Sequence, residues 1–365
     1  MAVEQSIKQL SAHPRDWTGG VDEYLKQNGI TATKVTPLEG GTSCYLWRID
    51  GMGSTDGSAS TDATPLVVPT VLKSADSMAK AGPIAVDPNR LQVEVKALRS
   101  RAVTVACRQV PTVRVPSILR ETHHGIVMSW AGDIDLRTLH KTDTSSDLSS
   151  IGTRLGSWLA CLHLEAIASG PDEFDIGNKA LEMAFSGPGG VEEQVIRSVF
   201  SAADDIDCVL NLLRTPPPVR TVTHWDFRPS NIVLNTSCED TASPDLTVVD
   251  WELCHYGDPA NDIRMWVAEN LIMEAKHRDQ GLLSSFLTAY KRRVGDSIVD
   301  EAFVRRVSVA VGVFFLYFIG QGAELWGFTE KDLQEWTCIA MEYLNAGTHN
   351  DVAWLRQSVL RHLMN

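Results

Sequence analysis

Several features that mark other classes of protein are absent from this sequence of 365 residues. Its seven cysteines are scattered and none is spaced as Cys-x-x-Cys, so we expect free thiols in a reducing compartment rather than disulfides or a zinc site. Residues 1–10 are polar and lack the apolar segment of a secretory signal, and the longest apolar run, residues 307–319, is shorter than the roughly 20 residues that cross a bilayer. We therefore expect a cytoplasmic protein without a membrane partner, in which the apolar run is a buried helix.

Basic residues are also scarce. Lys and Arg total 33 against 46 Asp and Glu, which gives a formal net charge of −13. Such a surface repels a phosphate backbone, and no basic cluster relieves it, so nucleic acid is not an expected partner and a neutral or cationic small molecule suits the charge better. Hydrophobic residues at 44% and charged residues at 22% are typical of a globular protein, which excludes disorder, collagen and coiled coil as descriptions of the whole chain.

The pattern of elements predicts two lobes that join near residue 130. The first reads mainly as strands, at residues 35–38, 45–49, 66–72, 112–115 and 125–130, with one clear helix at 90–101. The second reads mainly as helices, at residues 151–168, 192–213, 263–276, 282–294, 301–320, 330–346 and 352–364, with a short β-rich island at 219–251. We expect an α+β fold with a small β-rich N-terminal lobe, residues 1–130, and a larger, mainly helical C-terminal lobe, residues 131–365.

The most informative motif lies in the β-rich island. His224, Asp226 and Asn231 form a His-x-Asp-x-x-x-x-Asn pattern in a loop that leads directly into an apolar strand. A second apolar strand, residues 246–249, ends on Asp250. Each of these residues could instead cap a turn or bond to the backbone, but the ordered set favours catalysis.

The turn-forming residues 235–245 allow the two strands to pair as an antiparallel hairpin, which sets the start of one strand beside the end of the other. Asn231 and Asp250 would then stand side by side, with Asp226 on the loop above them. Two oxygen ligands near a further carboxylate suit Mg²⁺, which binds through few carboxylates and keeps several waters. Asp226 is left to orient a hydroxyl and to accept its proton.

This pattern resembles the catalytic machinery of protein-kinase-like phosphotransferases and is most similar to the aminoglycoside phosphotransferase family of small-molecule kinases. Residues 250–262, DWELCHYGDPAND, are similar to that family's DxE…GDPxxD segment and also look locally like 4-hydroxytryptamine kinase. The resemblance implies a two-lobed protein-kinase-like fold with ATP and Mg²⁺ as cofactors. It also implies Asp226 as the catalytic base, Asn231 and Asp250 as Mg²⁺ ligands, and Glu252 as a ligand of a second metal.

Two residues of the loop depart from the pattern of that family. Arg228 stands where protein kinases place a lysine near the transferred phosphate and where many aminoglycoside-type relatives have histidine. Its guanidinium suits phosphate oxygens. Trp225 replaces the small residue that is usual between the histidine and the aspartate.

The N-terminal lobe predicts a buried ion pair. Lys73 ends the apolar run 66–72, and Glu94 shares the inward stripe of its helix with Leu91 and Leu98. A carboxylate on a buried face is costly without a partner, so we expect Lys73 to pair with Glu94 and to reach the α- and β-phosphates of ATP, as the resemblance also implies. Glu94 could instead lie at the edge of the stripe, in water.

Two further segments complete the expected nucleotide site. A turn that could cover phosphates through its backbone N–H groups consists of Gly40, Gly41, Thr42 and Ser43. Glycine pairs are common in ordinary hairpins, and the chain has neither GxGxxG nor a Walker A motif, so this turn alone is weak support. The resemblance places the hinge, whose backbone pairs with adenine, at Met128, Ser129 and Trp130.

The acceptor is expected to be a small molecule with a hydroxyl. Seven residues separate Asp250 from Asp258, too few for the activation segment that holds a peptide in protein kinases. Candidates for its pocket are Trp266, Glu269, Tyr317, Glu324 and Trp326. Aromatic and acidic side chains suit an amine-bearing acceptor, although each aromatic residue is more often part of the core.

Two other functions remain open from the sequence: a metal-dependent hydrolase, and a nucleotide-binding pseudokinase that serves as a regulatory module. The first leaves Lys73, Glu94 and the glycine turn without a purpose, and the apparently complete set of catalytic residues argues against the second. His163 is expected to be a satisfied core histidine, and Asp262 to have a structural role. The sequence does not identify the acceptor, the oligomeric state or the preference for ATP over GTP.

Overall fold

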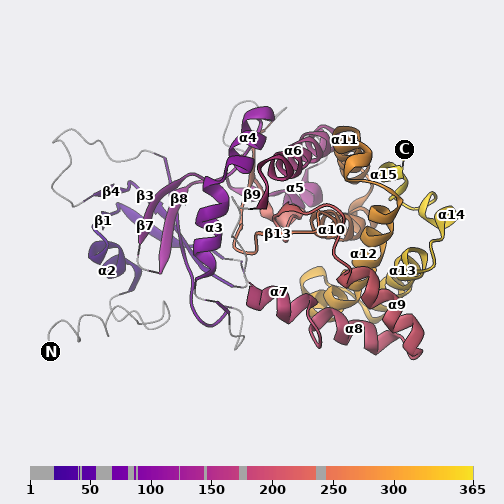
Figure 1. Ribbon diagram of the computed structural model, residues 1–365. Helices are drawn as coiled ribbons and strands as arrows, with labels where there is room; N and C mark the ends of the chain where they lie inside the picture. Colours follow the sequence, from indigo (N-terminus) through magenta and orange to yellow (C-terminus); the bar gives the residue numbers. More distant parts are fainter. Residues whose placement is uncertain are drawn as a thin grey trace. The chain divides into compact units, whose positions relative to one another are not determined.

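The computed structural model describes residues 20–39, 41, 43–54, 68–80, 86–87, 89–122, 124–143, 146–171, 179–235 and 244–364. The chain divides into two compact units, of which the first comprises residues 1–98 with 116–131 and the second comprises 99–115 with 132–365. Residues 99–115 therefore pack in the second unit, although the sequence pattern grouped them with the first lobe. The five-stranded sheet lies in the first unit and most helices lie in the second, so the predicted α+β class is confirmed (Figure 1).

The first unit is built on an antiparallel sheet with the strand order β2-β3-β5-β8-β7. Its strands are β2 (Lys34–Pro37), β3 (Tyr45–Asp50), β5 (Thr70–Ser74), β8 (Gly125–Ser129) and β7 (Ile118–Thr122). A small pair, β1 (Ile30–Thr31) and β4 (Gly53–Ser54), and the helices α2 (Gly20–Gln27) and α3 (Arg90–Arg99) complete it. The sequence did not predict β7, whose side chains alternate between half-buried and exposed and give no apolar run.

One face of this sheet forms a hydrophobic core. Leu72 on β5 pairs in register with Val127 on β8, and both side chains are fully buried in a cluster with Ile49 and Leu25. Because successive side chains of a strand point to opposite faces, the next residue, Lys73, points away from this core. The alternation therefore places the one lysine of β5 on the face opposite the hydrophobic cluster.

The second unit contains mostly helices and two small sheets, with the orders β6-β12-β11-β9 and β10-β13. Its strands are β6 (Val113–Arg114), β9 (Ile134–Asp135), β10 (Thr221–Thr223), β11 (Ile232–Leu234), β12 (Leu246–Val248) and β13 (His255–Gly257). Its helices are α4 (Arg101–Gln109), α5 (Leu136–Thr142), α6 (Leu148–Ser169), α7 (Lys179–Ser186), α8 (Val191–Val199), α9 (Ala203–Arg214), α10 (Ala260–His277), α11 (Leu282–Val294), α12 (Glu301–Trp326), α13 (Glu330–Thr348), α14 (Val352–Leu355) and α15 (Arg361–Met364), with 3-10 turns η3 (Pro229–Asn231) and η4 (Gly295–Ser297).

Three helices predicted as continuous are broken. The helix predicted at 90–101 ends at Arg99, because Ser100 adopts an extended backbone and its hydroxyl caps the next helix by accepting a hydrogen bond from Val103 N–H. The helix predicted at 192–213 is two helices separated by an extended Phe200 and Ala202. The C-terminal helix predicted at 352–364 is likewise two short helices, α14 and α15.

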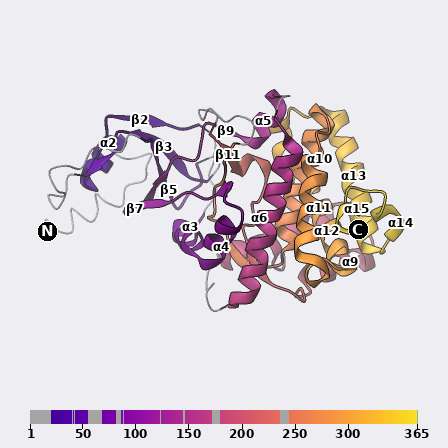
Figure 2. The same ribbon diagram turned by 90° about the horizontal axis from the view of Figure 1, so that it is seen from above.

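Helices α6 and α11 run side by side through the second unit (Figure 2). Two glycines of α6 allow the close approach, since a Cβ atom on Gly152 would lie 2.3 Å from the carbonyl oxygen of Leu282, and one on Gly156 would lie 2.2 Å from that of Phe286. Gly156 follows Gly152 on α6, and its neighbour Phe286 likewise follows Leu282 on α11, so the two helices are parallel. Further along both helices, His163 of α6 lies beside Tyr290 of α11.

In the described part of the chain, the segment Glu301–Ile319 of α12 is long and apolar enough to cross a membrane by length and composition, and 61% of it is buried inside the protein. Val309 and Val313 belong to a hydrophobic cluster with Ile196, Val209 and Leu344, from helices α8, α9 and α13. The prediction that this apolar run is a core helix is confirmed. The six cysteines that the structure describes are free thiols, as predicted.

Candidate active site

The first unit contains the predicted buried ion pair. Nζ of Lys73 lies 2.7 Å from Oε2 of Glu94, and the two side chains are 5% and 1% exposed. Lys73 belongs to β5, which pairs with β3 on one side and β8 on the other. Glu94 belongs to the buried face of helix α3. A buried ammonium that is paired with a carboxylate keeps its charge and a defined position, which is what contact with a phosphate group requires.

A second cation of this unit, Arg90, was not predicted. Its guanidinium is buried and donates to the backbone carbonyls of Asp76, Asp87 and Ser43, at 2.7, 2.8 and 2.7 Å. It thereby holds one end of the predicted glycine turn. Gly41 has φ of +68°, a conformation that favours glycine, while Gly40 and Thr42 lie outside the described residues.

Of the predicted hinge residues, Met128 and Ser129 are the last two residues of β8, and Trp130 follows the strand. Met128 pairs on one side with Val71 and on the other with Ile118, so the sheet already uses its backbone. Ser129 donates its backbone N–H to Ser117 O, at 2.9 Å. Trp130 lies beyond the strand, and the guanidinium of Arg48 stacks over its ring with 4.8 Å to the centroid.

In the second unit, the predicted hairpin is present. Ile232 of β11 pairs with Val248 of β12, and Val249 N–H donates to the carbonyl of Asn231 at 3.0 Å. This register brings the position of Asn231 next to the end of β12, where Asp250 follows with φ of +69°. The carboxylate oxygens of Asp250 and Glu252 lie within 4.8 Å of each other.

Asp226 is held from two sides. Nδ2 of Asn231 donates to its carboxylate at 2.8 Å and to its backbone carbonyl at 2.9 Å. Nε of Arg228 lies 2.9 Å from the other carboxylate oxygen. Burial acts to lower the pKa of Arg228, but the carboxylates of Asp226, Glu269 and Asp250 outweigh it and raise that pKa, so the guanidinium stays charged beside Asp226.

The donor set beside Asp226 fits a hard cation. Because the amide nitrogen of Asn231 donates to Asp226, its amide oxygen is the atom that can serve as a ligand. Asp250 and Glu252 add carboxylate oxygens, so all three predicted ligands offer oxygen atoms rather than nitrogen or sulfur. Oxygen donors of this kind suit Mg²⁺ rather than a soft transition metal.

The backbone of the catalytic loop is anchored by a buried carboxylate. Asp262, at the start of α10, accepts hydrogen bonds from the backbone N–H of Trp225 at 2.7 Å and of His224 at 3.0 Å. Trp225 has φ of +64°, a left-handed conformation that costs a bulky residue about 1–3 kcal/mol, and these bonds hold it there. The structural role predicted for Asp262 is therefore confirmed.

His224 connects this loop to the hairpin. Burial lowers the pKa of His224 more than the nearby Asp262 and Asp226 raise it, so the imidazole is neutral. Its Nδ1 accepts the backbone N–H of Asp226 at 3.3 Å, and Nε2 therefore donates to the carbonyl of Val249 at 2.9 Å. His224 thus acts on the backbone on both sides of the site and does not face a substrate.

Glu269 on α10 lies beside the same loop. Its carboxylate accepts a hydrogen bond from Ser230 Oγ at 3.4 Å and lies 3.7 Å from Arg137. Burial raises the pKa of Glu269, and the positive charges of Arg228 and Arg137 oppose that rise. Arg137 also stacks on Trp326, with 5.5 Å to the ring centroid, a contact between distant positions that no sequence pattern indicates.

The other pocket candidates separate into different environments. Trp266 is fully buried and stacks on Phe286 at 4.4 Å, so it is a core residue, which is the role that the sequence favoured for each aromatic candidate. Tyr317 is half-buried, and its ring meets Phe185 at 5.7 Å. The side chain of Glu324 lies outside the described residues.

A cavity of about 420 Å³ in the second unit has Trp225 and His255 among its lining residues. Two ion pairs border it, Arg306 with Asp258 at 2.9 Å and Arg264 with Glu192 at 2.5 Å. Among its described lining residues are neither Asp226 nor Asn231. The cavity therefore does not coincide with the predicted catalytic residues.

Comparison with known proteins agrees with the motifs. The profile of the phosphotransferase enzyme family (APH) matches residues 87–299, which include Glu94, Asp226, Asn231 and Asp250. No curated protein matches the sequence.

Three solved structures illustrate what the chain is similar to. Macrolide 2'-phosphotransferase MphH from Brachybacterium faecium is 16% identical, with 88% of this chain and 97% of that chain covered and a TM-score of 0.49. Ethanolamine kinase from Plasmodium vivax is 11% identical, with coverage of 86% and 82% and a TM-score of 0.45. A choline/ethanolamine kinase family protein from Mesorhizobium loti is 15% identical, with coverage of 100% and 98% and a TM-score of 0.46. Since the family profile covers more than half of the 365 residues, the chain belongs to the phosphotransferase enzyme family, as the sequence motifs predicted.

Proposed function

We propose that this protein is an ATP- and Mg²⁺-dependent kinase that transfers the γ-phosphate of ATP to a hydroxyl group of a small acceptor. The observation that carries the proposal is the setting of Asp226, whose carboxylate is held between Asn231 Nδ2 at 2.8 Å and Arg228 Nε at 2.9 Å. Membership in the phosphotransferase enzyme family supports the reaction class.

Asp226 would act as the general base. Each carboxylate oxygen has a second lone pair beyond the bond it already makes, so it can accept the acceptor's hydroxyl proton. As the acceptor oxygen bonds to the γ-phosphorus, the bond from that phosphorus to the β-phosphate oxygen breaks and ADP leaves. Arg228 would place a positive charge beside the transferred group, and catalysis of this kind depends mainly on such positioning and charge.

Asn231, Asp250 and Glu252 would hold Mg²⁺ through oxygen atoms. When bound, the ion would neutralise phosphate charge. Mg²⁺ is therefore expected to be required, and a chelator should stop turnover until Mg²⁺ is restored in excess.

The first unit would bind the nucleotide. Lys73, held by Glu94 at 2.7 Å, would contact the α- and β-phosphates, and the turn 40–43 would add backbone N–H groups. Adenine would meet the backbone around residues 128–130. Because Met128 lies within the sheet, in register with Val71 on one side and Ile118 on the other, the contact is expected at the end of β8 and beyond it.

The acceptor we propose is a small molecule that carries an amine as well as the hydroxyl. Around the loop, the carboxylates of Asp226 and Glu269 face the guanidinium groups of Arg228 and Arg137, and Asp135 adds a further negative charge near Glu269. An ammonium group would restore the balance of charge. Trp326, over which Arg137 stacks at 5.5 Å to the ring centroid, adds an aromatic ring beside one of these guanidinium groups.

The experiment that tests the function is a screen of hydroxylated amines and sugars with ATP and Mg²⁺, in which ADP release and product mass are measured. With the best acceptor, Asp226→Asn should lower kcat by about 10³-fold, within the range of general-base contributions, and leave the Kd for ATP within about twofold of the wild type. Asp207→Asn, an exposed aspartate on α9, is the matched control and should retain full activity.

Several outcomes would contradict the proposal. Undiminished turnover by Asp226→Asn would remove the proposed base. Hydrolysis of phosphoesters without nucleotide would favour the hydrolase, and ATP binding with no phosphorylated product across the whole screen would favour the pseudokinase.

A further inference from the structure

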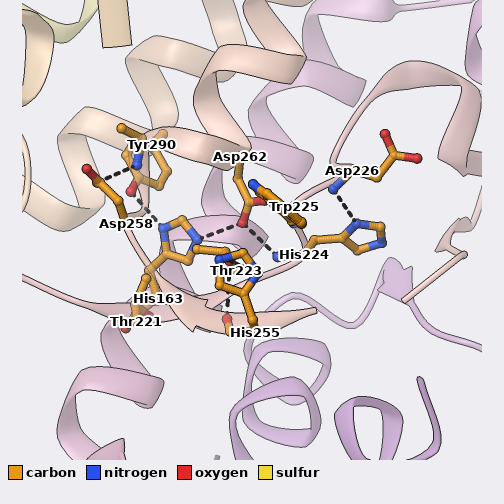
Figure 3. A network of polar contacts seen from close by, with 11 residues as sticks. His163, Thr221, Thr223, His224, Trp225, Asp226, His255, Asp258, Asp262 and Tyr290 are labelled. Carbon is orange, nitrogen blue, oxygen red and sulfur yellow. Dashed lines mark hydrogen bonds and ion pairs between the residues drawn. The ribbon is translucent and has the colours of Figure 1, made fainter. Parts of the chain in front are cut away.

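Behind the catalytic loop lies a hydrogen-bond network that the proposed reaction does not use (Figure 3). It joins Tyr290 of α11, His163 of α6 and Asp262 of α10, and all three side chains are fully buried. The hydroxyl of Tyr290 lies 2.8 Å from Nδ1 of His163, and Nε2 of His163 lies 3.1 Å from Oδ2 of Asp262. The same carboxylate oxygen also accepts the backbone N–H of His224.

The chemistry of the groups fixes the direction of these bonds. An ionised carboxylate can only accept, so Nε2 of His163 carries a proton and donates it to Asp262. Nδ1 of His163 therefore faces the hydroxyl of Tyr290, whose ring also meets the imidazole edge-on at 5.6 Å and 87°. Tyr290 thereby orients the imidazole, and the imidazole orients one oxygen of Asp262.

The other side of Asp262 faces the residues that precede the catalytic base. Its two oxygens hold the backbone N–H groups of His224 and Trp225, and Trp225 has the left-handed φ of +64°. The next residue is Asp226, whose own N–H bonds to His224 Nδ1 at 3.3 Å. A rotation of the Asp262 carboxylate would therefore shift the backbone from which the side chain of Asp226 projects.

We propose that His163 and Tyr290 are positioning residues for phosphoryl transfer: together they hold the Asp262 carboxylate in the orientation that places Asp226 for proton transfer. Neither residue touches the reacting groups. The inference rests on the proposed function, since it concerns the placement of the proposed base, but the geometry that it explains can be measured without turnover.

Removal of the tyrosine hydroxyl is the mildest test. Tyr290→Phe should lower kcat by about tenfold and leave KM for ATP within about twofold, because a small displacement of a catalytic group acts on the chemical step. Tyr343→Phe is the matched control, since Tyr343 is also a buried helical tyrosine, and in the described part of the chain its hydroxyl has no hydrogen bond to another side chain. It should retain the kcat of the wild type.

Substitution of the histidine separates position from packing. His163→Leu removes both bonds and should lower kcat by about 100-fold. His163→Gln keeps a side-chain N–H that can donate to Asp262, so its kcat should recover to within about tenfold of the wild type. If His163 only filled space, the kcat of His163→Gln would not exceed that of His163→Leu.

Hydrogen exchange followed by mass spectrometry supplies a readout that does not depend on activity. The peptide 221–234 contains the N–H groups of His224 and Trp225, and its exchange should accelerate in Tyr290→Phe and His163→Leu but not in Tyr343→Phe. If Tyr290→Phe kept the kcat of the wild type and unchanged exchange in this peptide, the proposal would be wrong. A loss of thermal stability with unchanged kcat and unchanged exchange would likewise overturn it.

Failure of the two proposals can be told apart. If the wild-type protein phosphorylated no acceptor, the proposed function would fail, whereas faster exchange at 221–234 in the variants would still support the anchoring of the loop. If His163→Leu did not fold, Tyr290→Phe and its control would decide the question.

Discussion

At the scale of single residues, each of the two units contains a buried ion pair at the predicted site residues. Lys73 meets Glu94, and Asp226 meets Arg228. Matched charges keep their ionised forms inside the protein, where a lone charge would be neutralised or exposed. Loss of one partner would leave the other charge buried and unmatched, so variants of the residues proposed for catalysis have to be judged on both activity and stability.

The ion pair of the first unit gives a prediction of this kind. Glu94→Gln removes the carboxylate that faces the Lys73 ammonium in a setting where the two side chains are 1% and 5% exposed. Breaking such a pair typically costs about 3 kcal/mol or more, so urea should unfold this variant at a clearly lower concentration, as followed by circular dichroism. The affinity for ATP should also fall.

A second variant separates these two effects. Lys73→Met combined with Glu94→Leu replaces the pair with apolar groups of similar size and should be more stable than Glu94→Gln, although it should bind ATP as weakly. Glu335→Gln, which removes an exposed pair with Lys331, should unfold like the wild type. Equal urea midpoints for Glu94→Gln and the wild type would show that the buried pair does not stabilise the unit.

At the scale of elements, local patterns decided what the sequence could predict. The hairpin of β11 and β12 follows from two apolar runs and one turn, and its register alone brings Asn231 beside Val249, the residue before Asp250. The stripe of α3 predicted the partner of Lys73 in the same way. Helix interruptions were missed, because a cap such as Ser100 involves only a few atoms and leaves the apolar periodicity intact.

The remaining parts of the site depend on contacts between distant positions. His163 and Asp262 are 99 residues apart, and no periodicity in either helix indicates that they meet. The stacking of Arg137 on Trp326 is of the same kind. Trp225 is a different case, since nothing in its residue type suggests φ of +64°, which is imposed by the bonds from its backbone to Asp262.

The packing of α6 on α11 sets the meeting of His163 with Tyr290, which leads to a prediction for this pair of helices. Gly156→Ala would place a Cβ atom 2.2 Å from the carbonyl oxygen of Phe286, so the helices would have to separate. This overpacking should lower the free energy of unfolding by about 1–3 kcal/mol despite the better helix propensity of alanine. Urea unfolding measures it.

Ser150→Ala is the control on the same helix, because the side chain of Ser150 is exposed, and its effect should stay within about 0.5 kcal/mol. A Gly156→Ala variant as stable as the wild type would mean that the helices can separate without cost. The close approach would then not fix the position of Tyr290.

At the scale of the whole molecule, the formal net charge of −13 favours the proposed acceptor, a small molecule that is not an anion. A protein of this charge attracts cations from a distance, and salt screens that attraction over about 10 Å at 0.1 M. ATP approaches as an anion against the same field, so its binding has to depend on short-range contacts such as the one proposed for Lys73.

This field predicts how salt should act on turnover. For an acceptor with a free ammonium group, kcat/KM should fall by several-fold between 25 and roughly 300 mM NaCl, because its approach is accelerated by long-range attraction. The N-acetylated form of the same acceptor has no charge, and its kcat/KM, measured at saturating ATP in the same buffers, should change by less than about twofold. The comparison cancels any effect of salt on ATP or on the fold, since both acceptors report on the same enzyme. If the two acceptors lost kcat/KM in parallel, the acidic surface would have no part in acceptor capture. If the acetylated form were the better substrate at low salt, the proposed preference for an amine would be wrong.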